Sequence, residues 1–325
     1  MNKKVVVLGG GTGQSNLLKG LKLFPLELTA VVSVADDGKS SGKLREKFNT
    51  PAVGDIRRVL ISLSETEDII EKLFDYRFKT VGEFDGHSVG NIILTALSDI
   101  YGNLSTGVKE ISKVFNLKGK VLPLTDDNVV LMAKMSDGKI IEGEHNITAS
   151  ELDIKKVFYK KNPKINDEVI ESIEDSDAII LSMGSLFTSV IPNLVSKDVI
   201  TAIDKSKSKI IYVCNIMTQP GETDDYTVSD HIKLLNSYLG KKKIDVVIVN
   251  NAKISKTMII KYHKLEQKDP VKLDKENIKT KIISKPLVAV AEDNTLKHDH
   301  IRLGLEILNY LIKKWFFLDI LSYFW

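Results

Sequence analysis

Residues Val5 to Leu18 read VVVLGGGTGQSNLL, an apolar run of strand type that enters a glycine-rich turn and continues as a helix. In such a unit, backbone N–H groups and the positive end of the helix converge on one point, which suits a phosphate. Gly10, Gly11 and Gly13 have no Cβ atom, so a ligand can approach the backbone closely, and the Thr12 hydroxyl adds a donor. We expect these four residues to bind a nucleotide or a sugar phosphate.

The glycine-rich turn is close to the dinucleotide-binding fingerprint but does not match it fully. Asn16 stands where a third glycine is expected when counting starts at Gly11. No Gly-Lys-Ser or Gly-Lys-Thr ends the turn, so it is not a Walker A loop. The turn alone leaves NAD, a mononucleotide and a sugar phosphate open as ligands.

The composition is that of an ordinary globular protein. The 325 residues are 43% hydrophobic, enough for a packed core, and the net charge of +3 is too balanced to indicate nucleic-acid binding. Cys214 is the single cysteine and lies in an apolar run, so we expect a small buried side chain and no disulfide. The start of the chain lacks the regions of a signal peptide. We expect a cytoplasmic protein without a transmembrane segment.

The C-terminal segment 312–325 is rich in aromatic residues. Lys313, Lys314 and Asp319 interrupt it, and it is too short to span a bilayer. We expect it to pack against the body of the protein or across a homodimer, with shallow membrane contact as an alternative. Its aromatic residues are Trp315, Phe316, Phe317, Tyr323, Phe324 and Trp325.

Apolar runs that alternate with helical patterns predict a Rossmann-like, doubly wound α/β fold. Runs that are apolar on both faces indicate a mainly parallel sheet with helices on both faces. The predicted strands are Lys4–Leu8, Leu28–Val34, Ala178–Ser182, Ile210–Cys214, Asp245–Val249 and Ile282–Pro286. The predicted helices are Gln14–Leu23, Asp55–Leu63, Asp68–Tyr76, Ser88–Tyr101, Leu104–Phe115, Asn166–Ser176, Ser196–Lys205, Val228–Leu239 and His298–Leu311.

One segment departs from this alternation. Two alternating runs flank the turn Ser136-Asp137-Gly138, which is typical of an antiparallel hairpin. We interpret Leu122–Tyr159 as a β insertion between the two halves of the α/β core. Because there is no internal repeat or long linker, we expect residues 1–325 to form a single domain.

Two acidic residues, Asp36 and Asp37, follow the second predicted strand. An acidic residue at this place in such a fold can bind a ribose, and a pair of carboxylates can instead bind Mg²⁺ next to a phosphate. Ser40, Ser41 and Lys43 come next and can donate to an anion at the start of a helix. A turn with a serine N-cap would explain each residue singly, but not the whole cluster.

Three further polar residues precede or begin predicted helices. Asp55 can serve as an N-cap or face the same crevice. His87 and Asn91 are four residues apart and can share a helix face, which would present an imidazole and an amide to a ligand. A lone histidine at a helix start is more often a packing residue. There is no HExxH motif or Cys/His cluster, so zinc is not expected.

The second half of the chain contributes two loops that follow apolar strands, Ser182–Ser189 and Asn215–Thr223. Parallel strands bring such loops to the carboxyl edge of the sheet, where ligands bind in open α/β folds. Asn215, Thr218 and Gln219 offer neutral donors and acceptors suited to a base or to sugar hydroxyls. We therefore expect five loops to form one site.

In order along residues 4–305, the motifs GGGTGQS, VADDGKSSGKLR, PAVGDIRR, GHSVGN, GSLFTSVIPNL and CNIMTQPGETDDYTVSDH closely resemble the YvcK-type gluconeogenesis factors of the CofD-like superfamily. The resemblance implies a cytoplasmic protein that binds UDP-glucose or UDP-N-acetylglucosamine. It also implies a role in cell shape and in growth on gluconeogenic carbon sources, with morphogenesis or cell-wall synthesis proteins as partners. The 2-phospho-L-lactate transferase branch instead transfers a phospholactyl group with a divalent metal, and by position Asp36 and Asp37 correspond to its acidic pair.

The chain departs from the family pattern at three places. Lys39 replaces a glycine, Ser182-Met183 replaces Gly-Pro, and Lys297 stands before His298 where the family has arginine. Lysine keeps the charge of arginine but loses its bidentate geometry.

Our leading hypothesis is a nucleotide-sugar-binding regulator. The glycine turn and residues 40–43 would bind the diphosphate, Asp36 or Asp37 a ribose or metal, and residues 215–219 the base or sugar. Lys297 and His298 would approach the sugar phosphates. The alternatives are a Mg²⁺-dependent phospho-group transferase and an NAD-binding protein. No pair of nucleophile and base is evident beyond the aspartates, which favours binding over catalysis.

Overall fold

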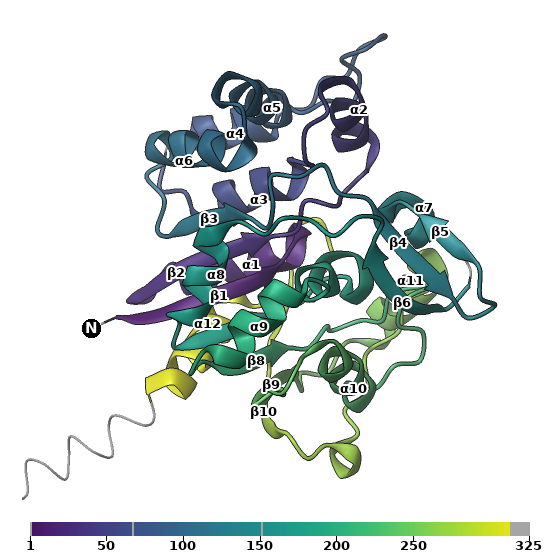
Figure 1. Ribbon diagram of the computed structural model, residues 1–325. Coiled ribbons are helices and arrows are strands. Elements are labelled where there is room, and N and C mark those ends of the chain that lie inside the picture. The colour runs from purple at the N-terminus through teal and green to yellow at the C-terminus, as the bar shows by residue number, and fades with distance from the viewer. Residues whose placement is uncertain (1, 67, 151, 313–325) are drawn as a thin grey trace, which may run out of the picture.

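A seven-stranded, all-parallel sheet forms the centre of the computed structural model, which describes residues 2–66, 68–150 and 152–312 (Figure 1). The strand order is β10-β9-β8-β7-β1-β2-β3. The strands are β1 (Lys3–Gly9), β2 (Leu26–Val32), β3 (Lys120–Pro123), β7 (Ala178–Leu181), β8 (Lys209–Val213), β9 (Val246–Asn250) and β10 (Lys281–Lys285).

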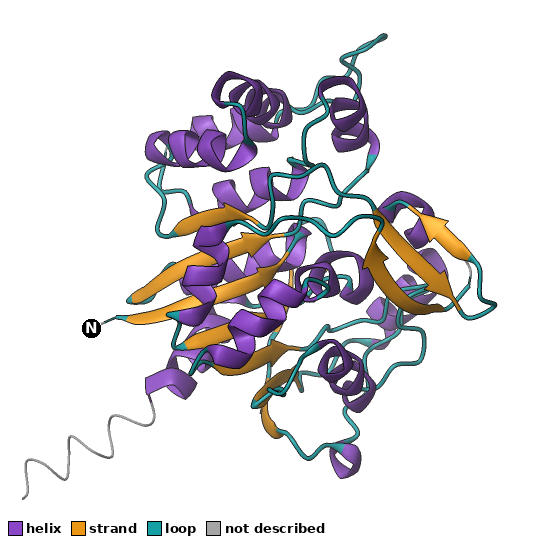
Figure 2. Cartoon of the chain, viewed as in Figure 1, coloured by secondary structure: helices purple, strands orange, loops and turns teal. Residues whose placement is uncertain are grey.

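Helices cover both faces of the sheet, which confirms the doubly wound fold (Figure 2). On one face α1 packs with α3 and α12, and on the other α8 packs with α9. The helices are α1 (Gly11–Leu21), α2 (Lys39–Phe48), α3 (Gly54–Leu63), α4 (Asp68–Asp75), α5 (Val89–Tyr101), α6 (Leu104–Val114), α7 (Glu144–Thr148), α8 (Asp167–Glu174), α9 (Lys197–Lys205), α10 (Val228–Tyr238), α11 (Lys256–Glu266) and α12 (His300–Ile312). Shorter helical turns are η1 (Leu186–Val190), η2 (Ile191–Leu194) and η3 (Lys275–Asn277).

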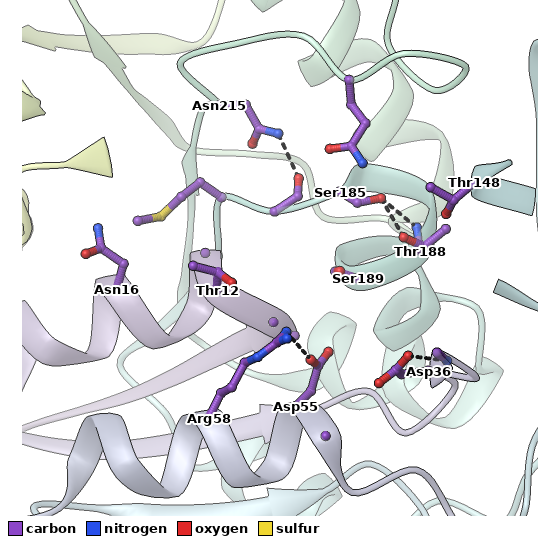
Figure 3. A pocket seen from close by; sticks show the side chains of 18 of the residues that line it. Thr12, Asn16, Asp36, Asp55, Arg58, Thr148, Ser185, Thr188, Ser189 and Asn215 are labelled. Carbon is purple, nitrogen blue, oxygen red and sulfur yellow. Dashed lines mark hydrogen bonds and ion pairs between the residues drawn. The ribbon is translucent and has the colours of Figure 1, made fainter. Parts of the chain in front are cut away.

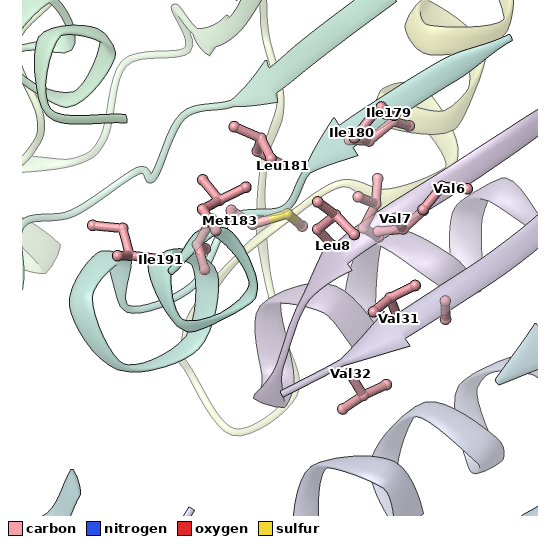
Figure 4. Packing of buried hydrophobic residues seen from close by; sticks show 14 of the residues in the cluster. Val6, Val7, Leu8, Val31, Val32, Ile179, Ile180, Leu181, Met183 and Ile191 are labelled. Carbon is pink, nitrogen blue, oxygen red and sulfur yellow. The ribbon is translucent and has the colours of Figure 1, made fainter. Parts of the chain in front are cut away.

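The core lies between the sheet and these helices. All four residues of β7 are buried, because helices cover both of its faces. Leu8 and Leu181, at the carboxyl ends of β1 and β7, belong to the same buried cluster as Met183 and Ile191 in the segment that follows β7 (Figure 4). The apolar core therefore extends to the edge of the sheet where the polar loops begin.

Every predicted strand and helix is present, with ends displaced by at most three residues. The helices α2, α7 and α11 lie outside the predicted set. Apart from Leu44 and Phe48, α2 consists of charged residues, serines and a glycine, so its sequence has no continuous apolar stripe. The aromatic residues 313–325 lie outside the described residues.

The predicted hairpin is present, but the insertion begins later than predicted. Residues 120–123 form β3, the edge strand of the main sheet next to β2, so the predicted start at Leu122 is wrong. The small antiparallel sheet contains β4 (Leu131–Met135), β5 (Ile140–Glu142) and β6 (Ile154–Tyr159). A two-stranded sheet of β11 (Val288–Val290) and β12 (Leu296–His298) precedes α12.

Among the described residues, no single helix is long and apolar enough to cross a membrane. One pair, Leu186–Leu194 and Lys197–Lys205, reaches that length and composition only when joined, and it bends by 67°.

Candidate functional site

The sheet order reverses between β1 and β7, and a cleft of about 750 Å³ opens there at the carboxyl ends of the strands (Figure 3). This switch point is where open α/β sheets bind ligands. Three predicted site residues, Asp37, Lys43 and His87, do not line the cleft. The predicted residues that line it are Gly10, Gly11, Thr12, Gly13, Asp36, Ser40, Ser41, Asp55, Asn91, Asn215, Thr218, Gln219, Lys297 and His298.

The glycine-rich turn has a packing role that its sequence did not reveal. A Cβ atom on Gly13 would lie 1.4 Å from the carbonyl oxygen of Met183, and one on Gly9 would lie 2.0 Å from the Ser182 hydroxyl. These two glycines therefore let the loops after β1 and β7 touch. Of the turn's glycines, Gly11 takes a positive φ, 63°. Asn16 ties α1 to β12, because its Nδ2 donates to the His298 carbonyl oxygen over 2.9 Å.

A carboxylate of the chain itself sits at the start of α1. The Asp55 carboxylate lies next to the backbone of Gly10 and Gly11, and 3.3 Å from the Arg58 guanidinium. Burial, and next the nearby negative charge of Asp36, raise the pKa of Asp55 to about 6. A carboxylate that titrates near pH 6 therefore lies beside the N-terminus of α1.

The two neighbouring aspartates, Asp36 and Asp37, point to different partners. Asp36 accepts from the Gly38 N–H over 2.8 Å and from the Ser41 hydroxyl over 3.0 Å. Asp37 accepts from the backbone N–H of His145 over 2.7 Å, at the start of α7. Asp36 lines the cleft and Asp37 does not, so the two carboxylates have different surroundings. Within the described ranges, no three His, Cys, Asp or Glu side chains are grouped to hold a metal ion.

The insertion contributes a carboxylate that the sequence motifs did not indicate. Glu144, at the start of α7, lines the cleft together with Asp36 and Asp55. Burial, followed by the charges of Asp36 and Asp55, holds the pKa of Glu144 well above its usual range. Glu144 reaches the cleft because the small antiparallel sheet packs beside it. The local sequence around Glu144 does not predict this packing.

Cationic side chains line the same cleft, so its electrostatic character is mixed. Of these, Arg57 is buried and paired with Asp75. The others are Arg58, Arg77, Lys268 and Lys297. A ligand with both hydroxyl donors and an anionic group would match this combination of carboxylates and cations.

His87 lies outside the cleft and contacts Ser40, which lines it. Its Nδ1 lies 3.1 Å from the Ser40 hydroxyl, which also accepts from Asn91 Nδ2 over 3.1 Å. Burial, and next the charge of Lys43, lower the pKa of His87. Of the predicted imidazole and amide pair, only Asn91 lines the cleft, and its buried Oδ1 has no hydrogen-bond partner in the described part of the chain.

Glu222 connects the two loops of the second half. It accepts from the Ser185 hydroxyl and, over 3.2 Å, from the Phe187 N–H at the start of η1. It is 4% exposed, and burial raises its pKa. Ser185 itself lines the cleft and caps η1 by accepting from the Thr188 N–H. Glu222 was not among the predicted residues, although it lies within a quoted motif.

The loop after β8 presents both used and unused polar atoms. Asn215 Nδ2 donates to the Gly184 carbonyl oxygen over 2.7 Å, whereas its Oδ1 is buried and has no partner among the described residues. The Thr218 hydroxyl accepts from the Asp269 N–H over 2.9 Å. Asn215 therefore keeps an acceptor, Oδ1, that no described residue uses. The Thr218 hydroxyl, by contrast, already accepts a hydrogen bond from within the protein.

The histidine of β12 is neutral near pH 7. His298 Nε2 lies 3.2 Å from the Cys214 carbonyl oxygen, and burial lowers the pKa of His298 to about 4. In this state it can offer hydrogen bonds but no positive charge to a sugar phosphate. The Cys214 side chain is buried, and burial raises the pKa of its thiol to about 12, so the structure confirms the predicted buried role.

The parallel sheet and the cleft at its switch point define a doubly wound α/β protein with a candidate ligand site where such sheets bind ligands. A family model described as 2-phospho-L-lactate transferase CofD matches residues 5–291, so this chain belongs to the CofD family.

Relatives with established names agree with this assignment. The chain is 42% identical over 309 residues to the gluconeogenesis factor of Halalkalibacterium halodurans, covering 94% of this chain and 96% of that protein. It is 43% identical over 302 residues to the gluconeogenesis factor of Bacillus subtilis, covering 91% and 94%. A crystal structure of a Bacillus halodurans member of the UPF0052 family is 42% identical, has a TM-score of 0.91, and matches over 94% of this chain and 100% of that one.

Proposed function

We propose that this protein is a regulator that binds a nucleotide-sugar in the switch-point cleft and acts as a gluconeogenesis factor. One observation carries the proposal: a single cleft of about 750 Å³ joins the glycine-rich turn after β1 to the Asn215 loop after β8. Sites for small molecules typically have volumes of roughly 300–1,000 Å³. The cleft is therefore large enough for a diphosphate with a ring system on each side.

Each part of a nucleotide-sugar has a matching part of the cleft. The backbone at Thr12 and Gly13, at the start of α1, and the cations Arg58 and Lys297 suit the diphosphate. Asn215 Oδ1 is a buried acceptor that no described residue uses, so it can accept a hydrogen bond from an N–H of a base. The carboxylate of Asp36 can accept from ribose or sugar hydroxyls.

The physiological part of the proposal comes from the relatives, two of which are named gluconeogenesis factors. We infer a cytoplasmic protein that supports growth on gluconeogenic carbon sources and normal cell shape, through contacts with morphogenesis or cell-wall synthesis proteins. Ligand binding, rather than turnover, would then be its primary activity.

Calorimetric titration of the full chain tests the ligand class. We expect UDP-glucose or UDP-N-acetylglucosamine to bind more tightly than GDP or NAD. Asn215→Ala should weaken binding about tenfold, the loss expected for about 1.4 kcal/mol. Asn2→Ala serves as the control, because Asn2 is exposed next to the other end of β1.

Two results would count against this proposal. No binding of any UDP-sugar at millimolar concentration would refute the ligand class, and preferential binding of NAD would favour the dinucleotide alternative. Release of nucleotide from a nucleotide-linked donor in the presence of Mg²⁺ would instead indicate a transferase.

A further inference from the structure

A second groove, of about 880 Å³, lies between the small sheet and the helices α9 and α10. It shares no lining residue with the switch-point cleft. Its β6 side contains residues 155–158, and its helical side contains Ile200 and Tyr238. Leu194 and Val195 also line it and give it an apolar part. The groove therefore needs an explanation separate from nucleotide binding.

The groove carries an unbalanced positive charge. Lys134, Lys155, Lys156 and Lys197 line it and all four are exposed, and the described residues that line it include no Asp or Glu. Some exposed lysines elsewhere on the surface have ion-pair partners, as in Lys160 with Glu142. None of the four groove lysines has an ion pair with another described residue. An anionic partner would complement this charge.

The strand β6 presents a free edge to the groove. The order of the small sheet is β5-β4-β6, so β6 pairs with β4 on one side only (Figure 1). A register shift opposite Lys134 and Met135 leaves Lys155 without a partner residue, as in a β-bulge. The Val157 N–H points away from β4 and donates to the Tyr238 hydroxyl over 3.0 Å. At Val157 the free edge of β6 therefore faces Tyr238, a residue that lines the groove.

We propose that this groove binds an extended acidic segment of a partner protein, which adds as a strand to the edge of β6. Main-chain pairing with β6 would align the segment, and its carboxylates would contact Lys155, Lys156 and the two lysines beside them. A strand edge selects a polypeptide over a nucleic acid, because nucleic-acid bases and phosphates cannot continue a backbone ladder. Edge lysines can also serve only to prevent aggregation, and the experiment distinguishes that role.

Three peptides, titrated into the full chain and followed by fluorescence anisotropy, test the proposal. The first alternates Glu and Val, the second alternates Lys and Val, and the third is the first with proline in place of every second valine. We expect only the first to bind, because the second has the wrong charge and the third cannot donate along a ladder. Equal binding of the first and third peptides would refute edge pairing. No binding of the first peptide at millimolar concentration would refute the site.

Protein variants locate the binding. The double variant Lys155→Glu/Lys156→Glu should weaken binding of the first peptide at least tenfold. Lys207→Glu/Lys279→Glu makes the same change in net charge at exposed lysines outside the groove and should leave binding unchanged. Equal losses in both double variants would show that only net charge matters and would overturn the assignment.

A third variant tests the strand edge itself. Tyr238→Phe removes the hydroxyl that competes for the Val157 N–H, so it should leave binding of the peptide unchanged or tighten it. Hydrogen exchange at the Val157 amide of this variant should slow when the peptide is bound. Unchanged exchange there, or displacement of the peptide by an equimolar single-stranded oligonucleotide, would contradict strand addition.

Discussion

Replacing Gly13 by alanine tests how the switch point is built. The added Cβ atom would lie 1.4 Å from the Met183 carbonyl oxygen and 2.5 Å from its carbon, both backbone atoms. Side-chain Cβ atoms essentially never approach other heavy atoms closer than 3.0 Å, so the loop after β7 must move by at least about 1.6 Å. That movement separates the two loops that form the floor of the cleft.

The expected loss of stability follows from two opposing effects. Overpacking of a tight contact costs about 1–3 kcal/mol, and a clash with backbone atoms belongs at the upper end. Alanine is favoured over glycine within a helix by up to about 1 kcal/mol, and Gly13 lies in α1. We therefore expect Gly13→Ala to lower the free energy of unfolding by about 2 kcal/mol and the midpoint of thermal unfolding by about 4 °C.

Thermal and urea unfolding of the full chain measure this effect, with Gly184→Ala as the matched control. Gly184 lines the same cleft, but a Cβ atom there would meet nothing closer than 3.5 Å, an ordinary contact. We expect this control to stay within about 0.5 kcal/mol of the parent protein. An unfolding midpoint of Gly13→Ala equal to that of the parent protein would refute this packing role of Gly13. A larger loss of stability in Gly184→Ala than in Gly13→Ala would also refute it.

Three further predictions concern buried ionisable groups. The pKa of Asp55 is raised from 3.8 to about 6, so the folded state holds this proton more tightly than the unfolded state does. The free energy of unfolding should therefore fall by about 3 kcal/mol as the pH rises from about 4 to above 6. Asp55→Asn should remove this dependence, and urea unfolding at pH 4 and pH 7.5 measures it; parallel pH profiles would contradict the assignment. Glu222→Gln should cost less than about 1 kcal/mol because an acceptor remains for the Phe187 N–H, whereas Glu222→Ala should cost about 2–3 kcal/mol; equal losses in chemical denaturation would disprove the hydrogen-bonding role. Because Cys214 is buried and the pKa of its thiol is raised to about 12, a thiol reagent at pH 8 should label it only after unfolding; rapid labelling of the folded protein would show that the thiol is accessible.

The motifs predicted the position of the cleft better than the orientation of its side chains. Asp36 and Asp37 are adjacent in sequence, yet one lines the cleft and the other binds the first turn of α7. His87 does not line the cleft, because its buried ring contacts the Ser40 hydroxyl instead. Orientation of this kind depends on neighbours that are distant in the chain, which a local pattern does not contain.

The sequence by itself determined the doubly wound class of the fold, since apolar runs and helical periodicity are local properties of β1, α1 and their successors. It also placed polar loops at the carboxyl edge, because every parallel strand ends there. Only the tertiary structure decided that Gly13 packs on Met183, that Glu144 reaches the cleft from the insertion, and that β6 leaves a free edge beside four lysines. These features arise from contacts between segments tens to hundreds of residues apart, whose geometry is set when the sheet, helices and insertion pack together.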